Sequence, residues 1–286
     1  MSEDTTSTPL PSRRSLPALG IRTITGIILA AIVISVVMLA PPLYIILFLS
    51  LVAGLSYIEY SRMVPGLTLP ETVLGAIFCI ACLPAAYWLG FDAMPAALAL
   101  FLILSGFFCM LGTPALAIEK SARMSFGYVY IGGSISCLVA IMSLPQGRHW
   151  LLFILALVAL VDIAGYFTGT LLGRHKLAPR ISPNKSWEGV AGGLLAAAGG
   201  GWISSLWLTL PEAPWWGMIC LGVILGISSM VGDLFESALK RISGVKDSGK
   251  LLPGHGGLLD RMDGYLLAIP AFLLALHIWQ ALGAAD

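Results

Sequence analysis

Carboxylates and cations are concentrated in one stretch near the C-terminal end of this 286-residue chain. Asp233, Glu236 and Lys240 would share one face of a helix. Asp260 and Asp263 are also three residues apart, where an apolar run begins. Oxygen ligands without a Cys or His cluster suit Mg²⁺, which commonly takes one or two protein carboxylates and completes its shell with water and phosphate. We therefore predict that Asp233, Asp260 and Asp263 hold Mg²⁺, provided that the two helix ends converge.

Cations and a glycine-rich turn lie around these acids. The cations are Lys240, Arg241, Lys246, Lys250 and Arg261. The turn, Pro-Gly-His-Gly-Gly at 253–257, offers backbone N–H groups that could form an anion-binding nest. A metal ion flanked by Lys and Arg side chains is the arrangement that phosphoryl or nucleotidyl transfer requires. The alternative is a solvated loop whose charges pair with one another.

A second polar patch, at 173–189, separates two apolar runs. Ser182, Asn184 and Lys185 come just before the start of a helix, where free N–H groups bind phosphate readily, so we expect these side chains to contact phosphate. The alternative is a topology signal that meets lipid headgroups. Asp162 lies inside the preceding apolar run. Because a membrane-embedded carboxylate is costly, we expect it to line a polar cavity or to be hydrogen-bonded within the bundle.

The composition indicates which elements must position these residues. Hydrophobic residues make up 58% of the chain and charged residues 11%, against about 25% charged in an ordinary soluble domain. This excludes an ordinary soluble enzyme and a disordered chain. The net charge of +1 excludes a nucleic-acid binder that works by bulk charge. We predict an all-α polytopic integral membrane protein, without a disulfide framework, since the five Cys lie in apolar runs.

Nine apolar segments are long enough to cross the ~30 Å hydrocarbon layer as helices. They are residues 23–40, 43–60, 73–90, 94–112, 125–145, 150–172, 189–210, 215–235 and 264–283. With the N-terminus in the cytoplasm, 15 of the 16 Lys and Arg residues fall on the cytoplasmic side, and only Arg148 does not. The sequence therefore predicts about nine transmembrane helices, with the N-terminus inside and the C-terminus outside.

The chain also divides by the placement of its polar groups. We expect residues 1–22 to form a loose cytoplasmic segment. We expect residues 23–150 to form helices for packing, lipid access and a dimer contact, since their spans hold few hydrophilic groups. Residues 151–286 would then form the catalytic transmembrane domain.

The C-terminal polar stretch resembles the signature of the phosphatidate cytidylyltransferase family, also called CDP-diacylglycerol synthases. The family pattern S-x-x-K-R, K-D, Pro/Gly-x-H-G-G and D-R-x-D stands here at 237–241, 246–247, 253–257 and 260–263, with its spacings intact. Residues 182–189 look like the family's second recurring stretch. The resemblance covers residues 160–265 in detail, whereas the first 150 residues match only in being apolar and polytopic.

The resemblance implies a membrane-embedded, Mg²⁺-dependent transferase of phospholipid synthesis, usually a homodimer, that makes CDP-diacylglycerol and pyrophosphate from CTP and phosphatidate. It also implies a K⁺ ion beside the Mg²⁺. Lys240 would act at the reaction centre with the three aspartates, in the bacterial inner membrane and facing the cytoplasm. The expected substrate- and phosphate-binding residues are Ser182, Asn184, Lys185, Ser237, Arg241, Lys246, His255, Gly256, Gly257 and Arg261.

Three other functions are alternatives at this point. Another CTP-dependent lipid enzyme, such as a polyprenol kinase or a CDP-ether-lipid synthase, would share the metal and phosphate chemistry. A transporter could use Asp162 as an ion relay, but it should show inverted repeats, and the polar groups here lie in the second half only. A CDP-alcohol phosphotransferase needs an Asp-Gly-x-x-Ala-Arg stretch, which the sequence lacks.

Overall fold

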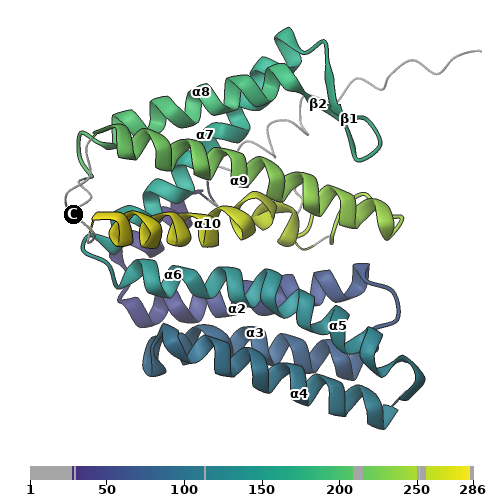
Figure 1. Ribbon diagram of the computed structural model, residues 1–286. Helices are drawn as coiled ribbons and strands as arrows, with labels where there is room; N and C mark the ends of the chain where they lie inside the picture. Colours follow the sequence, from purple (N-terminus) through teal and green to yellow (C-terminus); the bar gives the residue numbers. More distant parts are fainter. Residues whose placement is uncertain are drawn as a thin grey trace, which may run out of the picture.

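The computed structural model describes residues 28, 30–112, 114–208, 215–249, 251 and 256–283. Helices dominate this part of the chain and lie side by side in a bundle (Figure 1). The first group of helical elements is α2 (Pro42–Met63), α3 (Leu69–Leu89), η1 (Phe91–Ala93), α4 (Met94–Gly112), η2 (Pro114–Leu116), α5 (Ala117–Gly127), η3 (Tyr128–Gly133) and α6 (Ser134–Met142). The second group is α7 (Gly147–Leu172), α8 (Trp187–Ser204), α9 (Trp215–Ile242) and α10 (Leu259–Gly283).

The all-α polytopic class is confirmed by the length and composition of these helices. Seven helical segments of the described chain are long and apolar enough to cross a membrane. They are Pro42–Met63, Leu69–Leu89, Phe91–Gly112, Pro114–Met142, Gly147–Leu172, Trp215–Ile242 and Leu259–Ala281. The other two predicted spans also contain helix, namely Ala30–Leu39 and the 18-residue, glycine-rich α8. The count of nine spans and the orientation of the termini stay predictions.

The position of α10 decides how the two parts of the bundle meet. In Figure 1, α10 lies between the helices α2–α6 on one side and α7–α9 on the other. It contacts α9 most extensively, and it also contacts α6, α7 and α2. The helix that begins with Asp260 and Asp263 is therefore held by both halves of the chain.

Residues 176–186 form a short hairpin where the sequence indicated only a loop. Strand β1 (Lys176–Ala178) pairs antiparallel with β2 (Ser182–Ser186), so that Lys176 faces Ser186 and Ala178 faces Ser182. Ser186 then caps α8, because its Oγ accepts a hydrogen bond from the Gly189 N–H at 3.2 Å. This cap fixes how β2 enters α8, and it therefore fixes the direction of the hairpin.

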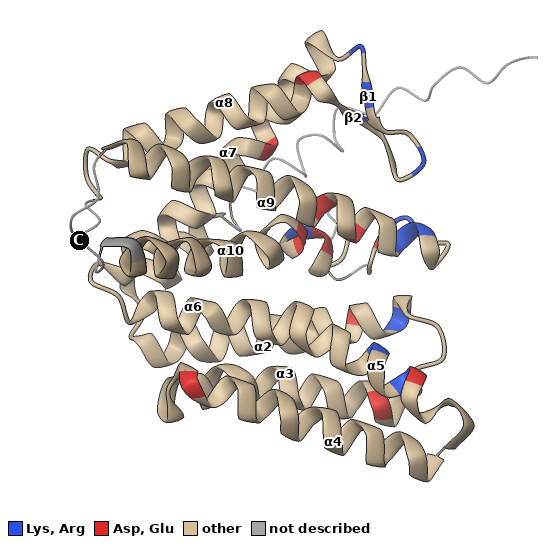
Figure 2. Cartoon of the chain, viewed as in Figure 1, with Lys and Arg blue, Asp and Glu red and all other residues tan. Residues whose placement is uncertain are grey.

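Charged residues gather mostly at one end of the bundle (Figure 2). That end holds the hairpin, the end of α9 and the start of α10, whereas the middle of the helices is largely free of charge. This separation is expected of a protein whose helices cross a hydrocarbon layer, because ionised side chains are costly inside it. The polar end is the one that the sequence predicts to be cytoplasmic.

Candidate active site

The C-terminal half of α9 lies against the start of α10, and this contact brings two of the predicted aspartates near each other. A Cβ atom on Gly232 would lie 2.5 Å from Asp263 O and 3.4 Å from Gly264 Cα, so a glycine lets the two backbones approach this closely. Asp233 follows Gly232 directly, and its carboxylate interacts electrostatically with that of Asp263. Helix α9 and the start of α10 therefore meet beside Asp233 and Asp263, and the metal site predicted there stays a prediction.

Asp162 from α7 belongs to the same group of charges. Its carboxylate interacts electrostatically with Asp233, Lys185 and Arg261, and also with Asp263. Three helices therefore supply one acid each to a cluster that we call the acid cluster (Asp162, Asp233 and Asp263). Like charges placed together are unfavourable unless cations compensate them. Asp162 is exposed in the described chain, so its predicted role in lining a polar cavity stays a prediction.

The hairpin carries a cation onto the acid cluster. Lys185 Nζ in β2 lies 2.5 Å from Asp233 Oδ2, and both side chains are about one-third exposed or less. Ser237, one turn further along α9, donates a hydrogen bond of 3.4 Å from its Oγ to Asp233 Oδ1. Arg241 Nε donates to Ile181 O at 3.2 Å, which ties the end of α9 to the hairpin. The two polar patches, distant in the sequence, therefore form one site.

Asp260 lies in a second network, beside the acid cluster. Its Oδ1 is 2.8 Å from Lys240 Nζ, and Lys240 Nζ is also 2.5 Å from Glu236 Oε2. The backbone N–H groups of Ser248 and Gly257 donate to Asp260 Oδ2 at 2.9 and 2.8 Å. Asp260 thus holds the connection between α9 and α10, and Lys240 is fixed between two carboxylates. The predicted role of Asp260 as a metal ligand stays a prediction.

The remaining predicted residues are less closely engaged. Ser182 lies in the backbone ladder of the hairpin, and Asn184 and Lys246 are exposed. Gly256 has a positive φ of 82°, which a glycine adopts readily, as expected of a glycine-rich turn. His255 lies outside the described residues, so its predicted role stays a prediction.

The chemistry of the donors fits Mg²⁺. The acid cluster offers carboxylate oxygens, which are the ligands that this hard cation prefers. Among the described residues, no group of three or more His, Cys, Asp or Glu side chains is arranged to hold a metal ion. Mg²⁺ does not require such a cage, because it commonly binds one or two protein carboxylates and takes its other ligands from water and substrate phosphate. Asp233 and Asp263 are the two carboxylates that would meet that need, and the Mg²⁺ site stays a prediction.

Two further polar side chains, Glu236 and Tyr130, are buried next to this site. Neither was predicted as a site residue from the sequence. Glu236 is fully buried, and its Oε1 has no hydrogen-bond partner within the described part of the chain. Tyr130, in the π-helical turn η3, has a buried hydroxyl that likewise finds no partner there. Its hydroxyl interacts electrostatically with Glu236, Asp263 and Asp233. Sequence patterns could not place it, because η3 comes from the other half of the chain.

Glu59 is the third residue that sequence reasoning missed. It lies in α2, is only 5% exposed and accepts a hydrogen bond of 2.8 Å from the Leu259 N–H at the start of α10. The sequence did contain a signal for Glu59, because this acid falls inside the predicted apolar span 43–60. An ionisable residue within an apolar span is a reason to suspect function.

A contact at the base of the hairpin lies outside the acid cluster. His175 Nδ1 is 2.6 Å from Glu188 Oε1, and the His175 N–H also approaches the same carboxylate. The hydrogen bond from His175 lowers the pKa of Glu188 to about 2. The pair therefore ties the entry to β1 to the first turn of α8.

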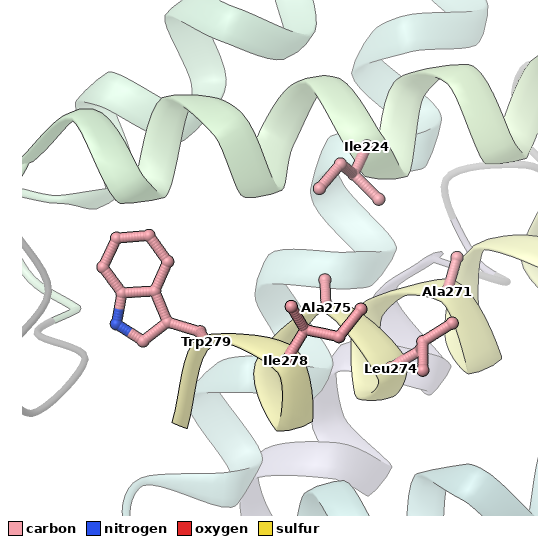
Figure 3. A pocket seen from close by; sticks show the side chains of 6 residues that line it. All are labelled: Ile224, Ala271, Leu274, Ala275, Ile278 and Trp279. Atoms are coloured by element: carbon pink, nitrogen blue, oxygen red, sulfur yellow. The ribbon is translucent and has the colours of Figure 1, made fainter. Parts of the chain in front are cut away.

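An apolar pocket lies between α9 and α10 (Figure 3). Its volume is 290 Å³, and it is lined by Ile224, Ala271, Leu274, Ala275, Ile278 and Trp279. Ile224 precedes Asp233 by nine residues, or about 13 Å along a helix. None of the lining side chains is ionisable, so the pocket is not part of the polar site.

The fold and the site together define a polytopic membrane protein with acids and cations gathered where its helices end. Residues 20–279 match the model of the cytidylyltransferase family. The chain is 34% identical over 255 residues to a phosphatidate cytidylyltransferase of Staphylococcus saprophyticus, which is 87% of this chain and 96% of that protein. The chain belongs to the cytidylyltransferase family.

Other relatives are similar over a shorter stretch. The phosphatidate cytidylyltransferase of Brucella suis is 50% identical over 124 residues, which are 43% of this chain and 45% of that protein. That of Mycobacterium bovis is 42% identical over 140 residues, or 49% of this chain and 45% of that protein. The matched region therefore spans less than half the length of these two relatives.

Proposed function

We propose that this protein is a phosphatidate cytidylyltransferase, which transfers CMP from CTP to phosphatidate and releases pyrophosphate. The observation that carries the proposal is the convergence of Asp233 and Asp263 beside Lys185 at the polar end of a membrane bundle. Family membership and the names of the relatives support it. Carboxylates and cations brought together in this way suit a reaction between two phosphate compounds.

The nucleophile in this reaction is a phosphate oxygen of phosphatidate. It forms a bond to the α-phosphorus of CTP, while the bond from that phosphorus to the oxygen bridging to the β-phosphorus breaks and pyrophosphate leaves. Because the second pKa of a phosphate monoester is about 6, the nucleophile is already ionised near neutral pH. The chain therefore does not have to supply a general base.

Cations of the chain would bind the phosphates and hold them in line. Lys185 and Lys240 are already fixed by carboxylates, so they need little reorganisation when substrate binds. Neighbouring donors would complete the binding of the triphosphate and the lipid phosphate. They are Ser182, Asn184, Ser237, Arg241, Lys246, His255, Gly256, Gly257 and Arg261.

Asp233 and Asp263 would hold Mg²⁺, with Asp260 as the third candidate ligand, and a K⁺ ion beside it is part of the proposal. When bound, the divalent ion would supply charge neutralisation to the phosphate oxygens. Asp162 would keep the polar cluster continuous with α7. The opposing charges also hold the chain's own cations in place near the reacting phosphates.

The membrane setting follows from the same substrates. CTP is water-soluble, so the polar end would face the cytoplasm, in the inner membrane of a bacterium. Phosphatidate would keep its phosphate at that boundary and approach between helices, with its acyl chains beside the apolar surface. A homodimer is the assembly that we propose.

Product analysis tests the function directly. Purified protein in detergent would receive phosphatidate, Mg²⁺ and CTP labelled in its cytosine ring. We expect the label to move into lipid with release of one pyrophosphate per lipid formed, and only when phosphatidate is present. A kinase would instead release labelled CDP and leave the lipid unlabelled. Absence of label in the lipid from folded wild-type protein would refute the proposal.

A further inference from the structure

One buried acid of the first half of the chain reaches the connection that carries the site. Glu59 Oε2 accepts the Leu259 N–H at 2.8 Å and also lies 3.3 Å from the donating hydroxyl of Ser248. Glu59 precedes Leu259 by 200 residues. The contact therefore joins α2 to the beginning of α10 and to the segment between α9 and α10.

The local packing shows that this connection is fitted around the carboxylate. A Cβ atom on Gly257 would lie 2.6 Å from Glu59 Oε2, and one on Gly249 would clash with Glu59 Oε1. Both positions therefore have no room for a side chain while Glu59 keeps its place. Within the described residues Glu59 makes no ion pair, so its charge is directed at a hydroxyl and at the N-terminus of α10.

The contacts of Glu59 continue into the site. Ser248, held by Glu59, donates its N–H to Asp260 and accepts the Asp260 N–H on its Oγ at 3.2 Å. Asp260 in turn binds Lys240. Asp263 lies one helical turn beyond Asp260, so the orientation of the first turn of α10 sets where Asp263 faces.

We propose that Glu59 is a positioning residue for the reaction centre, which it orients by capping α10 and by holding Ser248. The proposal rests on the function proposed above. It gives the first half of the chain a role in the reaction beyond packing, although that half does not carry the signature. Glu59 touches no reacting atom and acts through Ser248, Asp260 and the first turn of α10.

The test compares two changes at Glu59 with a matched control. Glu59→Ala removes the acceptor, whereas Glu59→Gln keeps an oxygen that can accept the Leu259 N–H. The control is Glu71→Gln, because Glu71 is also buried in the first half, at 4% exposure, and its Oε1 is 2.9 Å from Lys120 Nζ. The control therefore perturbs a buried carboxylate that has no contact with the connection.

Two measurements separate positioning from general stability. Hydrogen exchange of residues 256–263 in the substrate-free protein reports whether the start of α10 is held. CDP-lipid formation, corrected for the folded fraction, reports the consequence for the reaction. We expect Glu59→Ala to speed this exchange about tenfold and to lower kcat/KM about tenfold or more, because a lost cap frees the first turn. Glu59→Gln should stay within about threefold of wild type in both, since its oxygen still caps the helix.

Each possible result decides the proposal. Glu71→Gln should lower thermal stability and leave exchange at 256–263 and corrected turnover unchanged. Wild-type exchange in Glu59→Ala would overturn the proposal. Equal losses of corrected turnover in all three variants would also overturn it, since the effect would then be general. If wild-type protein makes no CDP-lipid, the proposed function fails, and so does the role in catalysis; the exchange data still decide whether Glu59 holds α10.

Discussion

The contact between Gly232 and Asp263 provides a quantitative test of the site. In Gly232→Ala, the new Cβ would lie 2.5 Å from Asp263 O, so α9 and α10 must separate by about 0.9 Å to reach the 3.4 Å of ordinary contact. Overpacking of this kind costs about 1–3 kcal/mol. The change from Gly to Ala in a helix returns about 1 kcal/mol. The net loss of stability should therefore be no more than about 2 kcal/mol.

The effect on the reaction should be much larger than the effect on stability. A misplacement of about 1 Å at a reaction centre lowers the rate about 100-fold. We therefore expect Gly232→Ala to fold and purify, but to form CDP-lipid about 100-fold more slowly than wild type. Thermal unfolding in detergent and transfer of label from CTP into lipid measure the two quantities on one preparation.

Two other glycines provide controls for this comparison. A Cβ on Gly201 would clash with Met218 O where α8 meets α9, whereas one on Gly199 would have nothing within 4 Å. Met218 is about 22 Å along α9 from Asp233. Gly201→Ala should lower stability but keep its turnover per folded molecule, and Gly199→Ala should lower neither. Turnover of Gly232→Ala within about threefold of wild type would refute the reasoning.

Three further predictions concern single side chains. Asp263→Asn should lower CDP-lipid formation at least about 100-fold in protein that still purifies normally, because it removes a proposed metal ligand; Asp92→Asn, in the exposed turn η1, should leave the rate unchanged. Lys240→Met should lower the free energy of unfolding, measured with denaturant, by about 3–5 kcal/mol, because it leaves the buried carboxylates of Glu236 and Asp260 without their cation. Adding Glu236→Gln should restore part of this loss, because it removes one of the two unpaired charges. The contact with His175 lowers the pKa of Glu188 to about 2, from the usual value of about 4.3. The contribution of this carboxylate to stability is therefore complete above about pH 5 and is lost as pH falls through 2. An NMR titration of that carboxylate should show the low midpoint, and a midpoint near 4.3 would contradict the contact.

The helices were predictable because few backbone conformations satisfy their hydrogen bonds inside lipid. A segment that crosses hydrocarbon must pair its own N–H and C=O groups, so a long apolar run is a strong signal for a helix. The hairpin at 176–186 lacks such a signal. Its strand β2 has the sequence Ser-Pro-Asn-Lys-Ser, which has low strand propensity, and it is held by pairing with β1 and by the capping of α8. Tertiary contacts, not local preference, determine this element.

The sequence indicated several of the residues that lie together at the polar end of the bundle, but it could not show how they pair, and their roles stay predictions. The spacing of Asp233, Glu236 and Lys240 correctly indicated one helical face. It could not show that Lys240 would bind Asp260 together with Glu236, or that Lys185 would reach Asp233 from the hairpin. Glu59 was the hardest case, because a contact between positions 200 residues apart leaves no periodic pattern in the sequence.

The balance of charge in the proposed site favours an ion that binds together with the nucleotide. The acid cluster gathers carboxylates from α7, α9 and α10, and Lys185 and Arg261 act on it. Lys240 also acts on Asp263 but is shared with Glu236 and Asp260, so the negative charge is only partly neutralised. A triphosphate alone would add negative charge to this cluster and be repelled, whereas a triphosphate that carries Mg²⁺ brings the compensating charge with it. A complete protein cage for the ion would occupy the positions that phosphate oxygens must take. The sparse arrangement of carboxylates therefore suits a reaction in which the metal bridges chain and substrate, and only the correct spacing of Asp233 and Asp263 has to be built into the fold.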